Sequence, residues 1–445
     1  MTAKENDVEQ VLSRAEHVLQ RDWITTASFR DIQDGNLCRR KQITILILNF
    51  LLVIFTIRHL VGLVAEDQSP WHLYVLNPFL GFGIFNRFSS SIYIFGYVML
   101  ALHGLTTLWA EREGKLTPIS GLRTMYNKLG ILSQEEYKQF TYFLRIMPYI
   151  RILGFIGVTI PMTLKRVVGA VMTGYQFHGM IFILYYFPVL VVACVLSQYT
   201  VHIFSYVHLI IAQSTSYFKI RLNRVENNLN KFVRQDTDGP VSRKSSFPNE
   251  LKRKAIKSKK KVDIDHVILD LQDILDELVD HNNLIKFYLR DSLYGVGGAY
   301  VNNLVFMLGP HPWYFRIIPL ITAVFGAVIM TISFTNASQL YIRILNMAKA
   351  LHSCQCVVGR ELSMAKRRAK SAPLTSRGSH VSQGLHLKSK FQVLRMIHRI
   401  SSPHLRIGYT VGNGESFSDD TAAAFVSNIV GNTLMFLNAV QGQGF

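Results

Sequence analysis

Long apolar runs recur along this chain, and they constrain its fold more than any other feature. About 20 consecutive apolar residues cross the hydrocarbon core of a bilayer as one α-helix, which satisfies its own backbone hydrogen bonds. Because 49% of the 445 residues are hydrophobic, the sequence predicts an all-α membrane protein with seven transmembrane helices. In chain order, these helices are expected at residues 44–64, 88–109, 148–168, 178–212, 284–308, 317–341 and 421–441.

The basic residues indicate how the chain is oriented. The formal net charge is +19, and most of the 48 Lys and Arg residues lie in four polar segments between the apolar runs. Basic clusters next to a span, such as Arg39 to Lys41, stay on the cytoplasmic side of a membrane. We therefore expect a cytoplasmic N-terminus and, after an odd number of spans, an extracellular C-terminus. This orientation is the inverse of a G-protein-coupled receptor, and the charge indicates a membrane surface as partner and no nucleic acid.

The predicted organisation has six parts. They are a cytoplasmic N-terminal region (1–43), transmembrane helices 1–4 (44–212), cytoplasmic helical extensions with a basic disordered insert (213–283), transmembrane helices 5 and 6 (284–341), a basic cytoplasmic linker and anchor helix (342–410), and transmembrane helix 7 (411–445). The apolar run that ends at Ala212 is longer than one bilayer needs, so the fourth helix should project into the cytoplasm. The composition of residues 363–390, rich in Ser, Gly and Arg, indicates the linker.

Two local patterns lie in the predicted cytoplasmic segments. Ser133 stands three residues before Glu136, which is the pattern of a capping box at a helix start. The acidic residues between Asp263 and Asp280 are interpreted as a solvated helix face. Their expected partner is the basic run from Lys252 to Lys261.

The last apolar run, 421–441, contains no charge but carries three asparagines. An unpaired amide in hydrocarbon costs free energy, so the face that holds them must meet protein or water. On a helical wheel this face also collects small residues, which would allow a close helix–helix contact. The alternative is that several copies of the helix surround a water-filled ion path. The candidate pore-lining residues are Ser427, Asn428, Gly431, Asn432, Met435, Asn438 and Gln441.

No catalytic pattern is present in the sequence. It contains no His-Glu-x-x-His, no phosphate-binding loop of the Walker type and no Gly-x-Ser-x-Gly. We therefore expect no enzyme activity, no cofactor and no metal site. A membrane transporter or a metabotropic receptor remains the alternative to a channel.

The order of these features resembles the invertebrate gustatory receptor family of seven-helix chemoreceptors. That family ends in Thr-Tyr, about five apolar residues, and Gln-Phe; here Thr433 and Gln441 match, while Leu434 stands in place of the tyrosine. The chain therefore resembles a divergent member. The resemblance implies a taste receptor of the plasma membrane that assembles as a homotetramer, or as a heteromer with related receptors, and opens a ligand-gated, non-selective cation pore lined by the seventh helix.

The resemblance also implies that a small molecule binds among the outer halves of helices 2–6. Aromatic side chains with a few polar groups suit an apolar or weakly polar ligand, although the same residues are also typical of ordinary helix packing. The candidate ligand-binding residues are Tyr93, Tyr97, Phe182, Tyr185, Tyr186, Tyr300, Asn303, Phe306 and Phe325.

Assembly is expected to depend on the cytoplasmic helices. Phe391, Leu394, Ile397 and Ile400 follow helical spacing. A single lipid-bound chain cannot bury these side chains or the apolar faces of the predicted cytoplasmic extensions, so we expect them to pack between subunits around a central axis.

Overall fold

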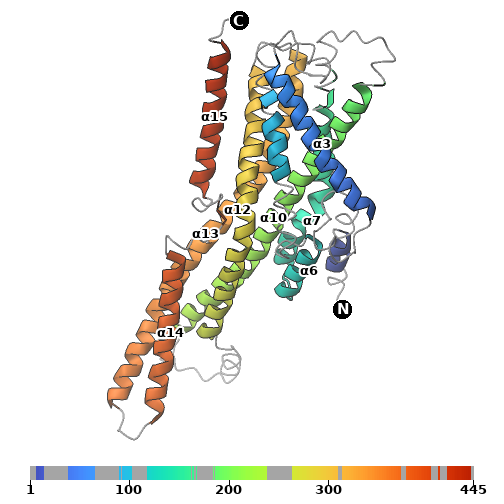
Figure 1. Ribbon diagram of the computed structural model, residues 1–445. Coiled ribbons are helices and arrows are strands. Elements are labelled where there is room, and N and C mark those ends of the chain that lie inside the picture. The colour runs from blue at the N-terminus through green and yellow to red at the C-terminus, as the bar shows by residue number, and fades with distance from the viewer. Residues whose placement is uncertain are drawn as a thin grey trace.

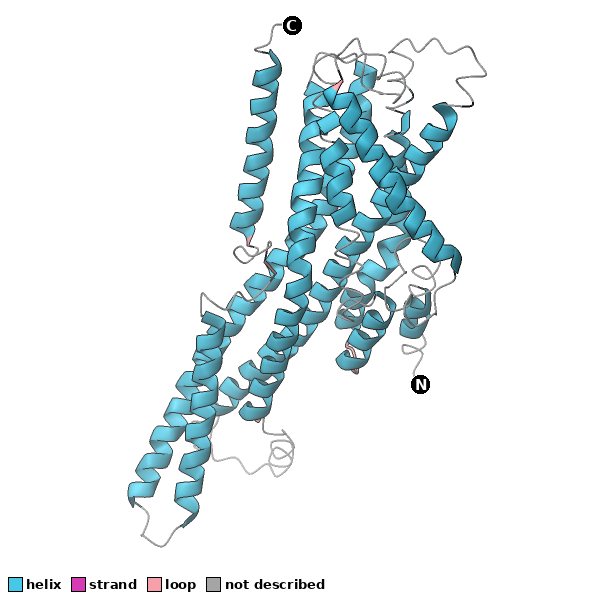
Figure 2. Cartoon of the chain, viewed as in Figure 1, coloured by secondary structure: helices cyan, strands magenta, loops and turns pink. Residues whose placement is uncertain are grey.

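The computed structural model shows a helical protein (Figures 1 and 2). The structure describes residues 7–14, 39–65, 90–91, 93–102, 118–161, 163–164, 167, 184, 186–237, 263–308, 313–371, 377–401, 409–410 and 418–441. The elements are α3 (Arg39–Val64), α6 (Pro118–Leu129), α7 (Gln134–Gly154), the π-helix η2 (Phe155–Thr159), α10 (Phe187–Thr237), α12 (Ile264–Leu308), α13 (Trp313–Ser371), α14 (Arg377–Ser401) and α15 (Asp419–Gln441).

Three helices are much longer than a bilayer is thick. The helices α10, α12 and α13 contain 51, 45 and 59 residues, which corresponds to roughly 70–90 Å at about 1.5 Å per residue. Figure 1 shows them running from the upper bundle into a lower extension. The fourth and fifth predicted spans thus continue as unbroken helices, as the sequence predicts.

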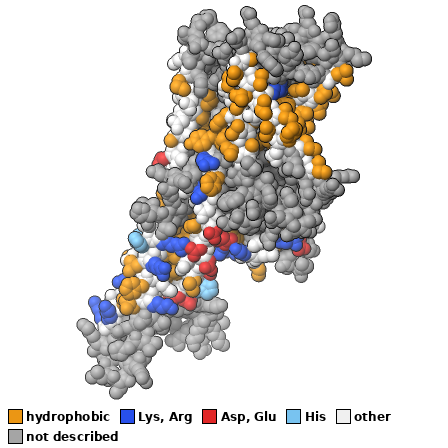
Figure 3. All heavy atoms as spheres, viewed as in Figure 1, with side chains coloured by type: hydrophobic (Ala, Val, Ile, Leu, Met, Phe, Trp, Pro, Cys, Tyr) orange, Lys and Arg blue, Asp and Glu red, His pale blue; other side chains and the backbone are white. Residues whose placement is uncertain are grey.

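The surface divides into an apolar and a charged part. Figure 3 shows hydrophobic side chains gathered on the upper part of the molecule and charged side chains on the lower part. Among the described residues, three helical segments could cross a membrane by length and composition, and three shorter apolar helices accompany them. These are Ile47–Val64, Gln134–Thr159 and Leu320–Met364, and then Tyr93–Leu102, Phe187–His202 and Ala423–Met435. Each overlaps a predicted span; the count of seven and the orientation stay predictions.

The predicted helix start at Ser133 is confirmed. The N–H of Glu136 donates to Ser133 Oγ (3.3 Å), and the N–H of Ser133 donates to Glu136 Oε2 (2.8 Å). The same carboxylate receives Arg224 Nε of α10 at 2.7 Å. This hydrogen bond, together with those from Ser133, lowers the pKa of Glu136 to about 2 despite its partial burial. The capping box therefore also fixes α7 against α10.

The helical extensions that we predicted to be cytoplasmic bury their apolar faces within the chain, which contradicts the expectation that only other subunits could bury them. Leu271, Ile274, Leu275 and Leu278 of α12 lie in one core with residues of α10, α13 and α14, and each is at most 1% exposed. Long neighbouring helices from the same chain supply the apolar surface that we expected only from other subunits.

The segment 363–390 is also helical where it is described, which corrects the predicted linker. The helix α13 continues to Ser371 and α14 begins at Arg377, so only the short stretch between them lies outside the described residues. Figure 1 shows α14 lying along the lower part of α13. Their contact buries Leu351, Val358 and Val393, and this packing outweighs the weak helix propensity of Ser and Gly.

One acid of α12, Glu277, has partners on two neighbouring helices. Glu277 Oε1 lies 2.9 Å from Lys128 Nζ of α6, and its Oε2 lies 2.5 Å from Arg221 Nη1 of α10. Burial opposes ionisation of Glu277, but these cations and the Tyr217 hydroxyl lower its pKa overall. The basic run Lys252 to Lys261 lies outside the described residues. The acids thus bind neighbouring helices, which hide part of the face that we interpreted as solvated.

The acids also fix α14. Asp276 of α12 forms an ion pair with Arg399, and Asp265 accepts a hydrogen bond from Ser389 Oγ at 2.7 Å. Arg399 and Ser389 both belong to α14, so this helix is held at two points along α12. Because α14 directly precedes the segment that leads to α15, the fixed helix defines where that segment starts.

Candidate functional site

The terminal helix α15 contacts its own chain through one face. Figure 1 shows it beside the upper part of α12, and it also contacts α13. The Phe425 ring meets Phe334 of α13 edge-on at 5.5 Å, and it lies so close to Gly297 of α12 that a Cβ there would be 3.0 Å from it. Ile429 and Thr433 continue this face and are 6% and 4% exposed. A glycine on α12 thus permits the close approach of α15.

The amide face of α15 points away from the chain. Six of the seven candidate pore residues are exposed, namely Ser427, Asn428, Gly431, Asn432, Met435 and Asn438. The side chain of the seventh, Gln441, lies outside the described residues. The helix therefore does not use its amides for a contact within this chain. In a bilayer, a second copy or water must cover them.

A third face of α15 is apolar and exposed. Val426, Val430 and Leu434 are 58%, 51% and 55% exposed. This face lies between the packed face and the amide face on the helical wheel. A ring of copies would accommodate all three faces, because each helix would meet its own chain, a neighbouring subunit and the central path.

Two buried residues hold the chain just before α15. The Tyr409 hydroxyl is 3.0 Å from Ser214 Oγ of α10, and burial raises the pKa of Tyr409 to about 12. The N–H of Thr410 donates to Asn282 Oδ1 of α12 at 2.9 Å, and Asn282 Nδ2 donates to Thr410 Oγ1 at 3.3 Å. The segment that precedes α15 is therefore fixed to both α10 and α12. We define Tyr409, Thr410, Ser214 and Asn282 as the α15 support.

The candidate ligand residues fall into separate places. Tyr93 stacks on His59 of α3 with ring centroids 5.3 Å apart, and Tyr97 lies 6.2 Å from Phe55. These rings belong to a cluster between α3 and α10 that includes Leu196. His59 and Phe55 were not among the predicted residues, because the sequence of one transmembrane helix does not indicate which other helix it packs against.

The other candidates lie nearer to α7 and to the main core. Phe325 of α13 packs on Gly154 and Gly157, where its side-chain atoms would lie 3.1 Å from a Cβ at either position. Tyr300 packs partly against the main core, while Asn303 and Tyr186 are each 4% exposed. Phe182, Tyr185 and the side chain of Phe306 lie outside the described residues. Among the residues that can be placed, the structure thus separates Tyr93 and Tyr97 from Phe325.

Comparison with known proteins identifies the fold. No family model and no curated protein matches the sequence. The structure aligns with that of the insect olfactory receptor OR5 from Machilis hrabei in complex with eugenol, with a TM-score of 0.56, 8% identity and coverage of 98% of each chain. This chain has the fold of an insect olfactory receptor. The alignment covers nearly the whole of both chains, so the olfactory-receptor fold includes the lower parts of α10, α12 and α13 as well as α15.

The olfactory-receptor fold agrees with the expected all-helical architecture. Sequence reasoning found α15 and its polar face, because both are properties of one continuous segment. It missed the α15 support, because the paired residues are far apart in the sequence. Asn282 and Thr410 are 128 residues apart, and Ser214 and Tyr409 are 195 residues apart. No sequence pattern marks these pairs.

Proposed function

We propose that this protein is a chemosensory receptor of the plasma membrane that acts as a ligand-gated, non-selective cation channel with a gustatory role. The observation that carries the proposal is the exposed amide face of α15 on a chain with the olfactory-receptor fold. Asparagine amides that face neither their own chain nor lipid suit a water-filled path between copies. The similar receptor was solved with eugenol, which supports a small-molecule ligand for this chain.

In the proposed channel, four copies of α15 surround the axis. Amide oxygens of Asn428, Asn432 and Asn438 then meet the ions at successive levels. The proposed lining contains no acid, and the nearest carboxylates are Asp419 and Asp420 at the start of the helix. A weak preference for cations follows, because amide oxygens carry only partial negative charge and the proposed lining supplies no carboxylate.

Cysteine scanning from Phe425 to Gln441 tests this arrangement. We expect a water-soluble thiol reagent to change the current of channels that carry a cysteine in place of Asn428, Asn432 or Met435. The current of channels with a cysteine in place of Ile429 or Thr433 should stay unchanged. The physical reason is that the first group is exposed and the second is buried against α12 and α13. Modification restricted to the buried group, or absent throughout, would contradict a pore along α15 and leave a helix–helix contact as the role of the amides.

Assembly is proposed to use the exposed part of α14. Ile397 and Ile400 are 8% and 7% exposed, so a charge there would unfold the chain itself. Phe391, in contrast, is 65% exposed. We expect Phe391→Glu to convert a tetramer into smaller species in mild detergent, because the charge would be desolvated at a subunit contact. Size measurement of the purified receptor checks this.

The matched control is Lys388→Glu on the same helix. Lys388 is exposed, and its replacement introduces the same carboxylate one turn away. We expect this variant to keep the native size. If Phe391→Glu also keeps the native size, α14 does not carry the assembly contact, and particle images of the unmodified receptor would have to locate it.

A further inference from the structure

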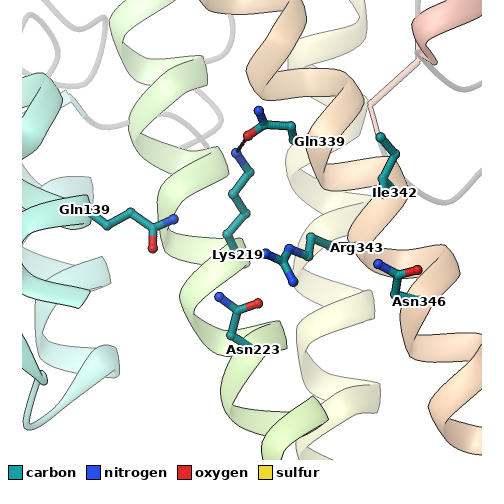
Figure 4. Close-up of a pocket in the computed structure, with 7 residues that line it drawn as sticks. All are labelled: Gln139, Lys219, Asn223, Gln339, Ile342, Arg343 and Asn346. Carbon is teal, nitrogen blue, oxygen red and sulfur yellow. Dashed lines mark hydrogen bonds between the residues drawn. The ribbon is translucent and has the colours of Figure 1, made fainter. Parts of the chain in front are cut away.

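A polar cavity of about 470 Å³ lies among α7, α10 and α13 (Figure 4). Two cations, Lys219 and Arg343, and four amides, Gln139, Asn223, Gln339 and Asn346, line it together with Ile342. In Figure 4, Gln139, Asn223 and Arg343 point toward one another from three different sides. None of the lining side chains is a carboxylate. The volume lies within the range of about 300–1,000 Å³ that is typical of small-molecule sites.

Lys219 is a buried cation with only amide partners among the described residues. It is 7% exposed, and its Nζ donates to Gln339 Oε1 at 2.5 Å and to Asn336 Oδ1 at 3.4 Å. Burial and the nearby Arg343 lower its pKa to about 8. A buried cation is normally paired with an acid. The cavity therefore presents positive charge that an anion would compensate.

Two further groups fit an anion with several oxygen atoms. Asn223 lines the cavity, and its Oδ1 is shielded from solvent and has no hydrogen-bond partner among the described residues. No hydrogen bond to Oδ1 therefore fixes which way this amide is turned, and its NH₂ group can donate into the cavity. Arg343 lies 3.8 Å from Glu226, a loose ion pair that leaves guanidinium N–H groups for other acceptors. Arginine and lysine side chains with amide donors are the usual ligands of phosphate groups.

The position of the cavity indicates the source of the anion. Gln339 lies two residues before the end of the sixth predicted span at 341, and Lys219 lies two turns beyond the end of the fourth at Ala212. The cavity therefore falls at the cytoplasmic surface of the bilayer. The Arg343 side chain is 45% exposed, and the neighbouring Ile342 and Leu345 are 42% and 43% exposed. A polar opening bordered by exposed aliphatic side chains suits a molecule with an anionic head and apolar chains.

We propose that this cavity binds the phosphate-bearing headgroup of an anionic phospholipid from the cytoplasmic leaflet. The phosphate oxygens accept from Lys219 Nζ, the Arg343 guanidinium and the Asn223 amide, while the acyl chains lie along Ile342 and Leu345. Basic pockets between helices at the cytoplasmic face bind such headgroups in other membrane proteins. A bound lipid would join α7, α10 and α13 where they enter the membrane.

The test compares lipid binding to the full-length receptor in nanodiscs by native mass spectrometry. The probes are nanodiscs of phosphatidylcholine alone and of phosphatidylcholine with added phosphoinositide. We expect the unmodified receptor to retain phosphoinositide selectively. Two variants should each weaken this retention about tenfold, because each removes a charge-assisted hydrogen bond. They are Lys219→Met, which keeps the side-chain length, and Arg343→Gln, at an exposed position that tolerates replacement.

Lys349→Met on α13 is the matched control, because Lys349 is exposed and does not line the cavity. It should retain the lipid like the unmodified receptor. Equal retention in Lys219→Met, Arg343→Gln and the control would overturn the proposal. A soluble inositol phosphate that binds as tightly as the lipid would overturn the membrane source and assign the cavity to a free phosphate compound.

Discussion

Replacing Met435 with serine is expected to raise the current measured without ligand to several times that of the unmodified receptor. Met435 is 57% exposed, and it stands between the amide levels of Asn432 and Asn438 on the proposed pore face. It is the bulkiest side chain of that face and apolar, so a ring of four would exclude water from the closed path. Serine is smaller and hydrates well, which would allow water and ions to pass without ligand.

Leu434→Ser is the matched control for this prediction. Leu434 is 55% exposed, nearly as much as Met435, but it lies on the apolar face of α15. We expect no ligand-independent current from it. The buried Ile429 offers a second control, since Ile429→Leu conserves volume and should change little. Whole-cell current, normalised to receptor at the cell surface, measures all three; an equal current from Leu434→Ser would exclude Met435 as a specific constriction.

Replacing Asn282 with alanine is expected to reduce the maximum ligand-evoked current while receptor still reaches the surface. The substitution removes both hydrogen bonds to Thr410 and leaves the buried Thr410 N–H without its acceptor. An unsatisfied buried group of this kind costs about 1–3 kcal/mol. Each 1.4 kcal/mol corresponds to about a tenfold change in an equilibrium constant. A penalty of this size that acts in the open state alone would therefore shift the equilibrium toward closed channels by roughly 5- to 150-fold.

The neighbouring Asn283 provides the control for Asn282. Asn283 is exposed, and its Oδ1 accepts a hydrogen bond from Lys286 of the same helix. Asn283→Ala should therefore leave the concentration–response curve unchanged. A normal curve from Asn282→Ala, at equal surface expression, would show that the α15 support plays no part in opening the channel.

The three faces of α15 show which structural features can be predicted from the sequence of one helix. The wheel arrangement correctly separated the amide face from Phe425 and Ile429, since helical periodicity alone decides which residues share a side. It did not reveal that Gly297 lies opposite Phe425, because that contact depends on how two helices approach one another. The candidate ligand residues show the same limit: Tyr97 faces α3, and Phe325 faces α7.

The sequence by itself determined the helical membrane class, the capping box at Ser133 and the polar face of α15. Each depends on the length, composition or period of one continuous stretch. Only the tertiary structure decided that the cytoplasmic helices bury their apolar faces in one chain, that Glu277 pairs with Lys128 and Arg221, and that Asn282 holds Thr410. These pairings join residues up to 149 positions apart in the sequence. In its local sequence, an acid or amide with such a partner looks like any exposed one, so only the packing of the helices selects the partner.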